Sequence, residues 1–410
     1  MNHSNSSAGA SMYTNEASTS RIKLLTYMMF FVFAMTSDAV GVIIPELIAK
    51  YDLSLTQASA FHYVPMVFIA LSGLFLGYLA DKLGRKITII AGLSLFSCAC
   101  FLFSAGNSFL YFLILLALIG VAVGLFKTGA LALIGDISSS SKQHTTTMNT
   151  VEGFFGVGAM VGPAIVSYLL ISGVSWKYLY ICAAVLCFML CIIAARTKYP
   201  TTKGHADAQI NLKSSLKLMK DPYAIGFSMA IALYVATEVA IYVWMPTLLA
   251  GYSGSWLWLA TYALTIFFAL RAGGRFFGVW MLKHFCWQQV MLWFSLAVFL
   301  CYLGTAIFGV EAAVILLPLS GLFMSMIYPT LNSKGISSFP EVQHGAVAGV
   351  ILFFTAVSAA IAPLLMGIVS DSFGHISYGF YLATFFAALL FLLGLFNVIK
   401  DPTKQNLDKE

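Results

Sequence analysis

The chain has 410 residues, of which 60% are apolar and only 9% are charged. A soluble domain carries about 25% charged residues because its surface faces water, so a soluble enzyme and a nucleic-acid-binding protein are both excluded. The apolar residues suffice for twelve membrane helices of about 20 residues each. The composition therefore predicts an all-α membrane protein, and its net charge of +6 needs a membrane explanation.

Residues 1–20 are rich in Ser, Asn and Thr and contain neither Lys nor Arg. This composition predicts a disordered tail, because a secretory signal begins with a basic region. Twelve apolar segments of spanning length follow it. They lie, to within a few residues, at 24–48, 58–79, 87–105, 109–134, 146–171, 176–195, 223–249, 256–282, 289–308, 312–333, 344–370 and 377–399.

The longest polar interruption, residues 196–222, separates the sixth segment from the seventh. Its stretch Leu212–Lys220 is compatible with a short amphipathic helix on the membrane surface. We therefore predict two six-helix bundles, 21–195 and 223–400, joined by this linker and followed by a tail at 401–410.

The basic residues predict the orientation of the chain. Seventeen of the 22 Lys and Arg residues fall in the termini and in the loops on their side, whereas the opposite side holds only Lys50 and Lys177. The positive-inside rule then places both termini and the central linker in the cytoplasm. For a bacterial chain this is the inner membrane.

An internal repeat relates the two bundles. Pro45–Tyr51 matches Pro246–Tyr252 at an offset of 201 residues, and Gly124–Phe126 matches Gly321–Phe323 at the slightly smaller offset of 197. Two parallel six-span repeats predict a carrier that rocks around a central binding site.

The loop between the second and third segments carries a compact motif, Gly77-Tyr78-Leu79-Ala80-Asp81-Lys82-Leu83-Gly84-Arg85-Lys86. Gly77 permits close helix approach, and Gly84 permits a sharp turn. Asp81 can accept hydrogen bonds from a neighbouring helix N-terminus, and the two basic residues can pair with acids or lipid phosphates.

This loop resembles the signature of the major facilitator superfamily. The resemblance implies two pseudo-symmetric six-helix bundles and a cytoplasmic gate formed by Gly77, Asp81, Gly84, Arg85 and Lys86. In the second repeat the motif has decayed, and we expect an asymmetric latch. There the three positions of Asp81, Gly84 and Arg85 hold Leu282, Phe285 and Cys286.

Ionisable side chains within the predicted spans are the main candidates for function, because each needs a partner or a water-filled cavity. Asp38 and Glu238 lie seven and eight residues before the matched prolines, each in the first helix of its repeat. A buried carboxyl can take up and release a proton during transport, so we predict both as proton-coupling groups. Structural ion pairing is the alternative for both.

Four further ionisable residues lie inside spans. Lys127 and Arg271 are predicted to contact the substrate, and Lys127 could instead pair with Asp38. Arg275 follows Gly274 near the cytoplasmic end of its span, and Glu152 also lies near that end. We therefore expect both in the cytoplasmic gate.

Aromatic residues accompany these charges. Tyr234, Glu238 and Tyr242 share one helical face with Trp244 close by, while Tyr328 and Asn332 lie one turn apart in the tenth span. Aromatic faces with a few hydroxyl and amide groups suit sugar rings, so these four aromatics and Asn332 are predicted substrate contacts. Packing is the alternative for each of them.

Several segments resemble the fucose-permease branch of that superfamily. They are Phe30–Asp38, Met148-Asn149 with Gly153–Gly158, Tyr234–Glu238 with Trp244, and Gly274-Arg275. The resemblance implies a proton-linked sugar symporter, with sodium as the alternative coupling ion. Lys127 stands where that branch carries a glutamate, which raises the prospect of an acidic solute.

The runner-up is a drug/proton antiporter. Gly158–Pro163 resembles the antiporter motif of the fifth helix, although Val166 and Ser167 replace its final glycine pair. No phosphate-binding glycine loop or CxxC pair with metal spacing occurs in the sequence, so we predict neither enzymatic activity nor a cofactor or metal site. The expected partners are a small solute, the coupling ion and the lipid bilayer, and the carrier is expected to be a monomer.

Overall fold

The computed structural model describes residues 5–76, 79–137, 141–199, 220–339 and 344–400. Throughout these ranges the regular structure is helical, without a strand. Ten of the described helices are long and apolar enough to cross a membrane. Helices α3 (Leu55–Leu76) and α13 (Ala263–His284), with 22 residues each, coincide with the second and eighth predicted spans. The all-α, multi-pass fold class is thereby confirmed.

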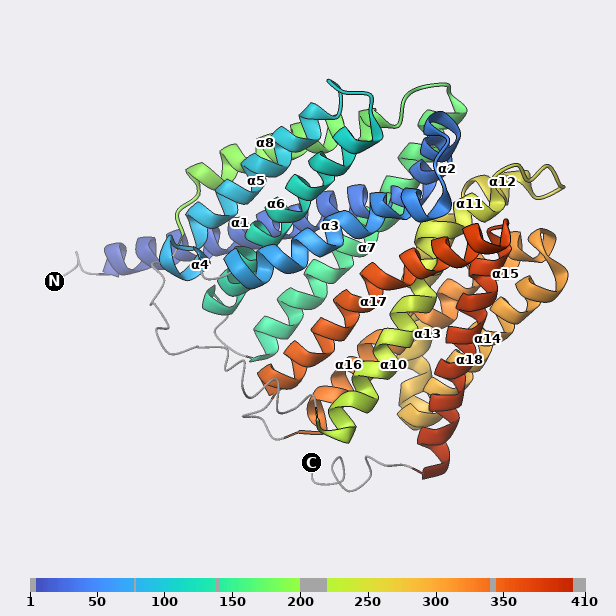
Figure 1. The fold of residues 1–410 in the computed structure, drawn as a ribbon. Coiled ribbons are helices and arrows are strands. Elements are labelled where there is room, and N and C mark those ends of the chain that lie inside the picture. Colours follow the sequence, from blue (N-terminus) through green and yellow to red (C-terminus); the bar gives the residue numbers. More distant parts are fainter. Residues whose placement is uncertain (1–4, 77–78, 138–140, 200–219, 340–343, 401–410) are drawn as a thin grey trace. The chain divides into compact units, whose positions relative to one another are not determined.

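Figure 1 follows the helices along the chain. In the first repeat they are α1 (Asn5–Ser37), α2 (Val40–Tyr51), α3, α4 (Leu79–Lys82), α5 (Arg85–Leu102), α6 (Phe109–Ile137), α7 (Ser141–Ile171) and α8 (Lys177–Arg196). In the second they are α10 (Pro222–Val239), the π-helical turn η1 (Ala240–Trp244), α11 (Met245–Leu249), α12 (Leu257–Thr261), α13, α14 (Trp287–Phe308), α15 (Val310–Met324), α16 (Ile327–Ser337), α17 (His344–Phe373) and α18 (Ser377–Lys400).

The termini and the linker differ in how far they are described. Helix α1 begins at Asn5, inside the segment for which composition predicts a disordered tail. Most of the linker, including the predicted amphipathic stretch Leu212–Lys220 apart from its last residue, lies outside the described residues, as does the tail 401–410. The seventh span begins with a well-formed cap, because the carboxylate of Asp221 accepts hydrogen bonds from the backbone N–H groups of Tyr223 and Ala224.

Three predicted spans are interrupted. The first breaks between α1 and α2, the seventh passes through η1, and the tenth breaks between α15 and α16. Prolines explain these interruptions, because a proline cannot donate to the carbonyl four residues before it and its ring crowds that carbonyl. The affected carbonyls belong to Gly41, Tyr242 and Ser325, upstream of Pro45, Pro246 and Pro329 respectively.

Contacts divide the chain into two compact units. Unit 1 contains residues 1–37 and 64–207, and unit 2 contains residues 38–63 and 208–410. Within unit 1, α1 packs on α7 and α5 packs on both α6 and α8. Glycines allow the close approach of α7 to α1, because a Cβ atom at Gly158 or Gly162 would lie 2.2 or 2.0 Å from the carbonyl oxygens of Phe31 and Met35.

Unit 2 combines the helices of the second repeat with a segment of the first. Its main packing pairs are α13 with α15, α14 with α18, and α10 with α17, which lie side by side in Figure 1. Helix α2 packs on α11 and on η1. Residues 38–63, from the first and second spans, thus share a core with the second repeat.

Candidate functional site

Two buried carboxylates mark the interruptions of the first and seventh spans. Asp38 follows the last residue of α1 and is 9% exposed, while Glu238 is the penultimate residue of α10, just before η1, and is 7% exposed. Single π-helical turns occur frequently at functional sites, and interrupted membrane helices expose backbone groups to ligands. Both acids therefore lie where a membrane helix can contribute to a binding site.

Glu238 forms an ion pair with Arg271 of α13, in which Oε1 contacts the guanidinium Nη1. Arg271 also experiences the fields of Tyr234, Asp38 and Tyr242, after the larger effect of Glu238. A charged pair inside a membrane protein requires such compensation. The structure therefore unites the two predicted coupling acids and one predicted substrate contact in a single electrostatic cluster of unit 2.

Tyr242 lies within η1 and joins the two helix interruptions. A Cβ atom added at Gly41 would lie 1.9 Å from the carbonyl oxygen of Tyr242, so α2 and η1 touch backbone to backbone. The Tyr242 ring contacts the rings of His62, at a centroid distance of 5.4 Å, and Phe268, at 6.5 Å. Both carboxylates act electrostatically on its hydroxyl.

Two other predicted substrate contacts have partners inside the protein. Tyr234 is fully buried and its hydroxyl donates to the carbonyl of Met324 at 3.1 Å. The indole N–H of Trp244, also fully buried, donates to the carbonyl of Pro363 at 3.1 Å. Satisfied polar groups of this kind fix the packing of a core. In this structure both residues hold α10 and η1 against their neighbours.

Tyr328 and Asn332 belong to α16 and are both partly exposed. The ring of Tyr328 lies 6.1 Å from that of Tyr234, between centroids. Together with Arg271 and Tyr242, these two residues supply amide, hydroxyl and guanidinium groups within unit 2. Hydrogen-bonding groups beside aromatic rings are suited to a polar solute.

Lys127 belongs to unit 1, on α6. Its ammonium lies 5.4 Å from the centroid of the Phe30 ring and 5.6 Å from that of Phe33, both on α1. Cation–π contacts stabilise an ammonium that has left bulk water. The predicted pairing of Lys127 with Asp38 would join residues of different units and stays a prediction.

The signature loop is only partly described. Gly77 lies outside the described residues, and of Asp81 only the backbone, in α4, is described. Gly84 has φ +89°, in the region that favours glycine. Arg85 Nε forms an ion pair with Asp136 Oδ2 of α6 at 3.0 Å.

The neighbouring Lys86 serves a different helix. Its ammonium donates to the carbonyls of Ala195 and Thr197, at 2.7 and 3.0 Å, at the end of α8. A cation at a helix C-terminus complements the helix dipole. Of the other predicted gate residues, Glu152 on α7 is exposed, and Arg275 on α13 acts electrostatically on Tyr234.

Unit 2 also contains a helix cap that the sequence analysis missed, at the start of α3. The carboxylate of Asp371, on α17, accepts hydrogen bonds from the backbone N–H groups of Leu55 and Thr56 at 2.9 and 2.8 Å. These groups begin α3, so the carboxylate stabilises the helix N-terminus. The spacing Gly367-x-x-x-Asp371-x-x-Gly374 repeats that of Gly77, Asp81 and Gly84, and could have revealed this site.

His62, in α3, is a second residue whose place in this site was not predicted from the sequence. Its side chain is only 1% exposed, against Tyr242. It approaches the backbone of Ala359, but neither ring nitrogen makes a well-formed hydrogen bond. Unsatisfied buried polar groups are rare and call for an explanation.

Comparison with known proteins is consistent with this geometry. A family model described as Major Facilitator Superfamily matches residues 26–363. The L-fucose-proton symporter of Escherichia coli (strain K12) is 25% identical over 415 residues, covering 90% of this chain and 91% of the symporter. Quinolone resistance protein NorA of Staphylococcus aureus (strain MSSA476) is 25% identical over 388 residues, covering 88% and 92%.

Among solved structures, a bacterial homologue of the human lysosomal transporter Spinster, in an inward-facing and occupied conformation, superposes with a TM-score of 0.74. It is 14% identical, and the match covers 92% of this chain and 96% of that one. At this identity the likeness concerns the fold alone.

Proposed function

Since the chain belongs to the Major Facilitator Superfamily, we propose that it carries a small polar solute, a sugar or a sugar-like acid, together with a proton. The chain is a multi-pass membrane transporter, and its relatives are transporters rather than enzymes. Alternating access, in which solute and proton bind to one facing state and leave from the other, is the proposed mechanism. Sodium is the alternative coupling ion.

The observation that carries this proposal is the pair of buried acids at matched helix interruptions. Asp38 and Glu238 lie seven and eight residues before the matched Pro45 and Pro246, and Glu238 is held by Arg271. A coupling group must change its proton occupancy between the two facing states. Asp38 is suited to this task because the chain passes from unit 1 to unit 2 between Ser37 and Asp38, so a movement between units changes its surroundings.

We assign the solute to the polar groups of unit 2. Arg271, Tyr242, Tyr328 and Asn332 present charge, hydroxyl and amide groups beside aromatic rings. A solute carboxylate would compete with Glu238 for the guanidinium, which links solute binding to the second acid. Lys127 would add a second cation from unit 1, so acidic solutes should compete better than neutral ones of the same shape.

The similarity to the L-fucose-proton symporter supports a sugar-like solute. The similarity to NorA, which is of equal identity, together with the close packing of Gly158 and Gly162 on α1, favours a second candidate function, drug/proton antiport. The two functions differ in direction, since a symporter carries solute and proton the same way and an antiporter carries them oppositely.

The proposal also assigns one side of the protein to the cytoplasm and places a gate there. We propose that both termini and the Arg85–Asp136 pair face the cytoplasm of the bacterial inner membrane, because the basic residues gather there. The gate would contain Gly77, Asp81, Gly84, Lys86, Glu152 and Arg275, and the carrier would act as a monomer.

Uptake into proteoliposomes tests the proposal. Labelled sugars and sugar acids are offered with an inward proton gradient, with no gradient, and with a sodium gradient. Accumulation that requires the proton gradient supports symport. Efflux of ethidium driven by the same gradient, without uptake of any sugar or sugar acid, would replace it with the antiporter function.

A further inference from the structure

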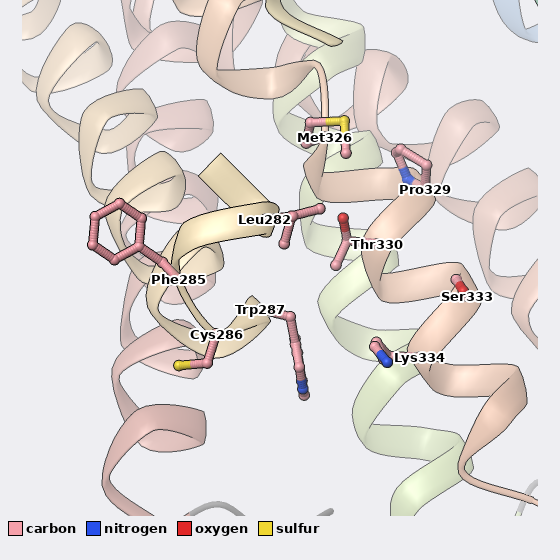
Figure 2. A pocket seen from close by; sticks show the side chains of 9 residues that line it. All are labelled: Leu282, Phe285, Cys286, Trp287, Met326, Pro329, Thr330, Ser333 and Lys334. Carbon is pink, nitrogen blue, oxygen red and sulfur yellow. The ribbon is translucent and has the colours of Figure 1, made fainter. Parts of the chain in front are cut away.

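A cavity of about 510 Å³ lies in unit 2 between the end of α13, the start of α14 and helix α16. Figure 2 shows its lining, including Cys286 and Trp287 on one side and Thr330, Ser333 and Lys334 on the other. We call it the α13–α16 pocket. Its volume is within the range of pockets that bind small ligands.

The internal repeat explains why this cavity exists. The offset of 201 relates Arg85 to Cys286, and the offset of 197 relates Asp136 to Ser333. In the first repeat the arginine and the aspartate form an ion pair at 3.0 Å. In the second repeat two small side chains replace them and both line the pocket. The space left by the missing ion pair is therefore part of this cavity.

The pocket is rich in hydrogen-bond donors and has a net positive charge. Lys334 is the one charged residue in its described lining, and no described carboxylate forms an ion pair with it. Thr330, Ser333 and Lys334 share one face of α16 by their spacing, and Trp287 adds an indole N–H. A partly buried cation beside several donors favours an anion with several acceptor oxygens, such as a phosphate.

The remaining lining is apolar, and α13 carries exposed aromatic side chains on the side turned away from the pocket. Phe285, which lines the pocket, is 40% exposed. Trp280 and Phe276, which precede Phe285 in the chain and belong to α13, are 52% and 82% exposed. Exposed aromatic side chains of a membrane helix contact lipid tails and the headgroup region.

We propose that the α13–α16 pocket binds the phosphate headgroup of an anionic phospholipid. Lys334 supplies the charge, Thr330, Ser333 and Trp287 donate hydrogen bonds to the phosphate oxygens, and the acyl chains extend past the exposed Phe285 into the bilayer. The site is independent of the transported solute and of the coupling ion. It would also make the packing of the end of α13 against α16 sensitive to the lipid composition of the leaflet.

Alkylation of Cys286 by N-ethylmaleimide provides a direct test, because this thiol is exposed and lines the pocket. The purified chain is reconstituted into nanodiscs of phosphatidylcholine, with or without phosphatidylglycerol, and modification is followed by peptide mass spectrometry. Cys98 and Cys182, also exposed, report any general effect of the lipid. Phosphatidylglycerol should slow modification of Cys286 by about fivefold at a few times its dissociation constant.

Variants decide whether the pocket is responsible. Lys334→Gln should abolish the protection and Lys334→Arg should retain it, while Lys283→Gln, which removes an exposed lysine outside the pocket, should leave it intact. The double variant Cys286→Arg/Ser333→Asp rebuilds the ion pair of the first repeat. It should retain one fewer phosphatidylglycerol molecule in native mass spectrometry.

Three outcomes would overturn the proposal. The first is an equal rate of Cys286 alkylation with and without phosphatidylglycerol, and the second is protection that survives in Lys334→Gln. The third is protection of Cys286 by inorganic phosphate or glycerol phosphate when phosphatidylglycerol itself gives no protection. The last result would assign the pocket to a soluble phosphate. If Lys334→Gln does not fold, the number of phosphatidylglycerol molecules retained by Cys286→Arg/Ser333→Asp decides instead, and an unchanged number would overturn the proposal.

Discussion

Asp38 and Glu238 lie near the interruption of the first span of each repeat and have different surroundings. Both are buried directly before or within a helix interruption in unit 2. Glu238 is fixed by an ion pair with Arg271, whereas Asp38 begins the segment that leaves unit 1. Each repeat therefore carries a carboxyl group close to the interruption of its first span, while the local packing gives one acid an ion-pair partner and places the other where the chain passes from unit 1 to unit 2.

We infer that Asp38 and Glu238 have different roles. An acid paired with a cation is fixed in position by that pair and orders its surroundings. An acid at a junction changes its environment when the units move. We therefore expect removal of the two charges to have different consequences for coupling and for stability.

The largest effect is expected for Asp38→Asn. The amide cannot bind or release the proton, so accumulation driven by a proton gradient should be abolished, while exchange of labelled for unlabelled solute at equal pH persists. Both are measured in proteoliposomes. Glu46→Gln, which changes an exposed acid of α2, should behave as the unaltered protein. Retained uphill uptake in Asp38→Asn would transfer the coupling role to Glu238 or to sodium.

The next effect is expected for Glu238→Gln, which leaves the buried guanidinium of Arg271 without its partner. Loss of one partner of a buried ion pair lowers the free energy of unfolding by about 3–5 kcal/mol, and thermal unfolding in detergent should report it. The double variant Glu238→Gln/Arg271→Met removes both charges and should recover most of the loss. A single variant as stable as the unaltered protein would contradict the assigned pairing.

A smaller effect is expected where the two interruptions touch. Gly41→Ala would bring a methyl group against the carbonyl of Tyr242 and should lower stability by about 1–3 kcal/mol. Gly226→Ala, at a glycine of α10 with nothing within 4 Å of its added Cβ, is the matched control and should be neutral or slightly stabilising. Equal stability of both variants would mean that α2 and η1 are not in close contact.

The smallest effect is expected for His62→Gln. Because His62 packs on Tyr242, which experiences both carboxylates, the change should alter the KM for the solute by up to about tenfold, or about 1.4 kcal/mol. The proton-driven accumulation ratio should stay unchanged. A change in that ratio at unchanged KM would instead assign His62 to coupling.

Local sequence signals predicted the apolar spans and the placement of both carboxylates within them, because hydropathy along the chain and the positions of Pro45 and Pro246 can be read from the sequence directly. The partners were not accessible in this way. The Glu238–Arg271 pair and the buried hydrogen bonds of Tyr234 and Trp244 depend on how helices distant in sequence pack together. From the sequence alone, an aromatic residue that contacts a solute cannot be distinguished from one that donates a hydrogen bond to a backbone carbonyl.

The α13–α16 pocket likewise depends on helix packing and was not predicted from the sequence. The decay of the signature motif in the second repeat was visible in the sequence, but its consequence was not. Whether a lost ion pair is filled by neighbouring side chains or leaves a cavity depends on the packing of α14 and α16. The Asp371 cap of α3, in contrast, has a spacing that sequence inspection could have recognised.

The sharing of residues 38–63 with unit 2 also affects how the chain is assembled during synthesis. Helix α2 leaves the ribosome well before its packing partners η1 and α11, which lie roughly 200 residues later. At a translation rate of about 5–20 residues per second this delay lasts roughly 10–40 s. During that interval residues 38–63 lack their final neighbours, so the N-terminal repeat reaches its native packing only after the second repeat has been inserted.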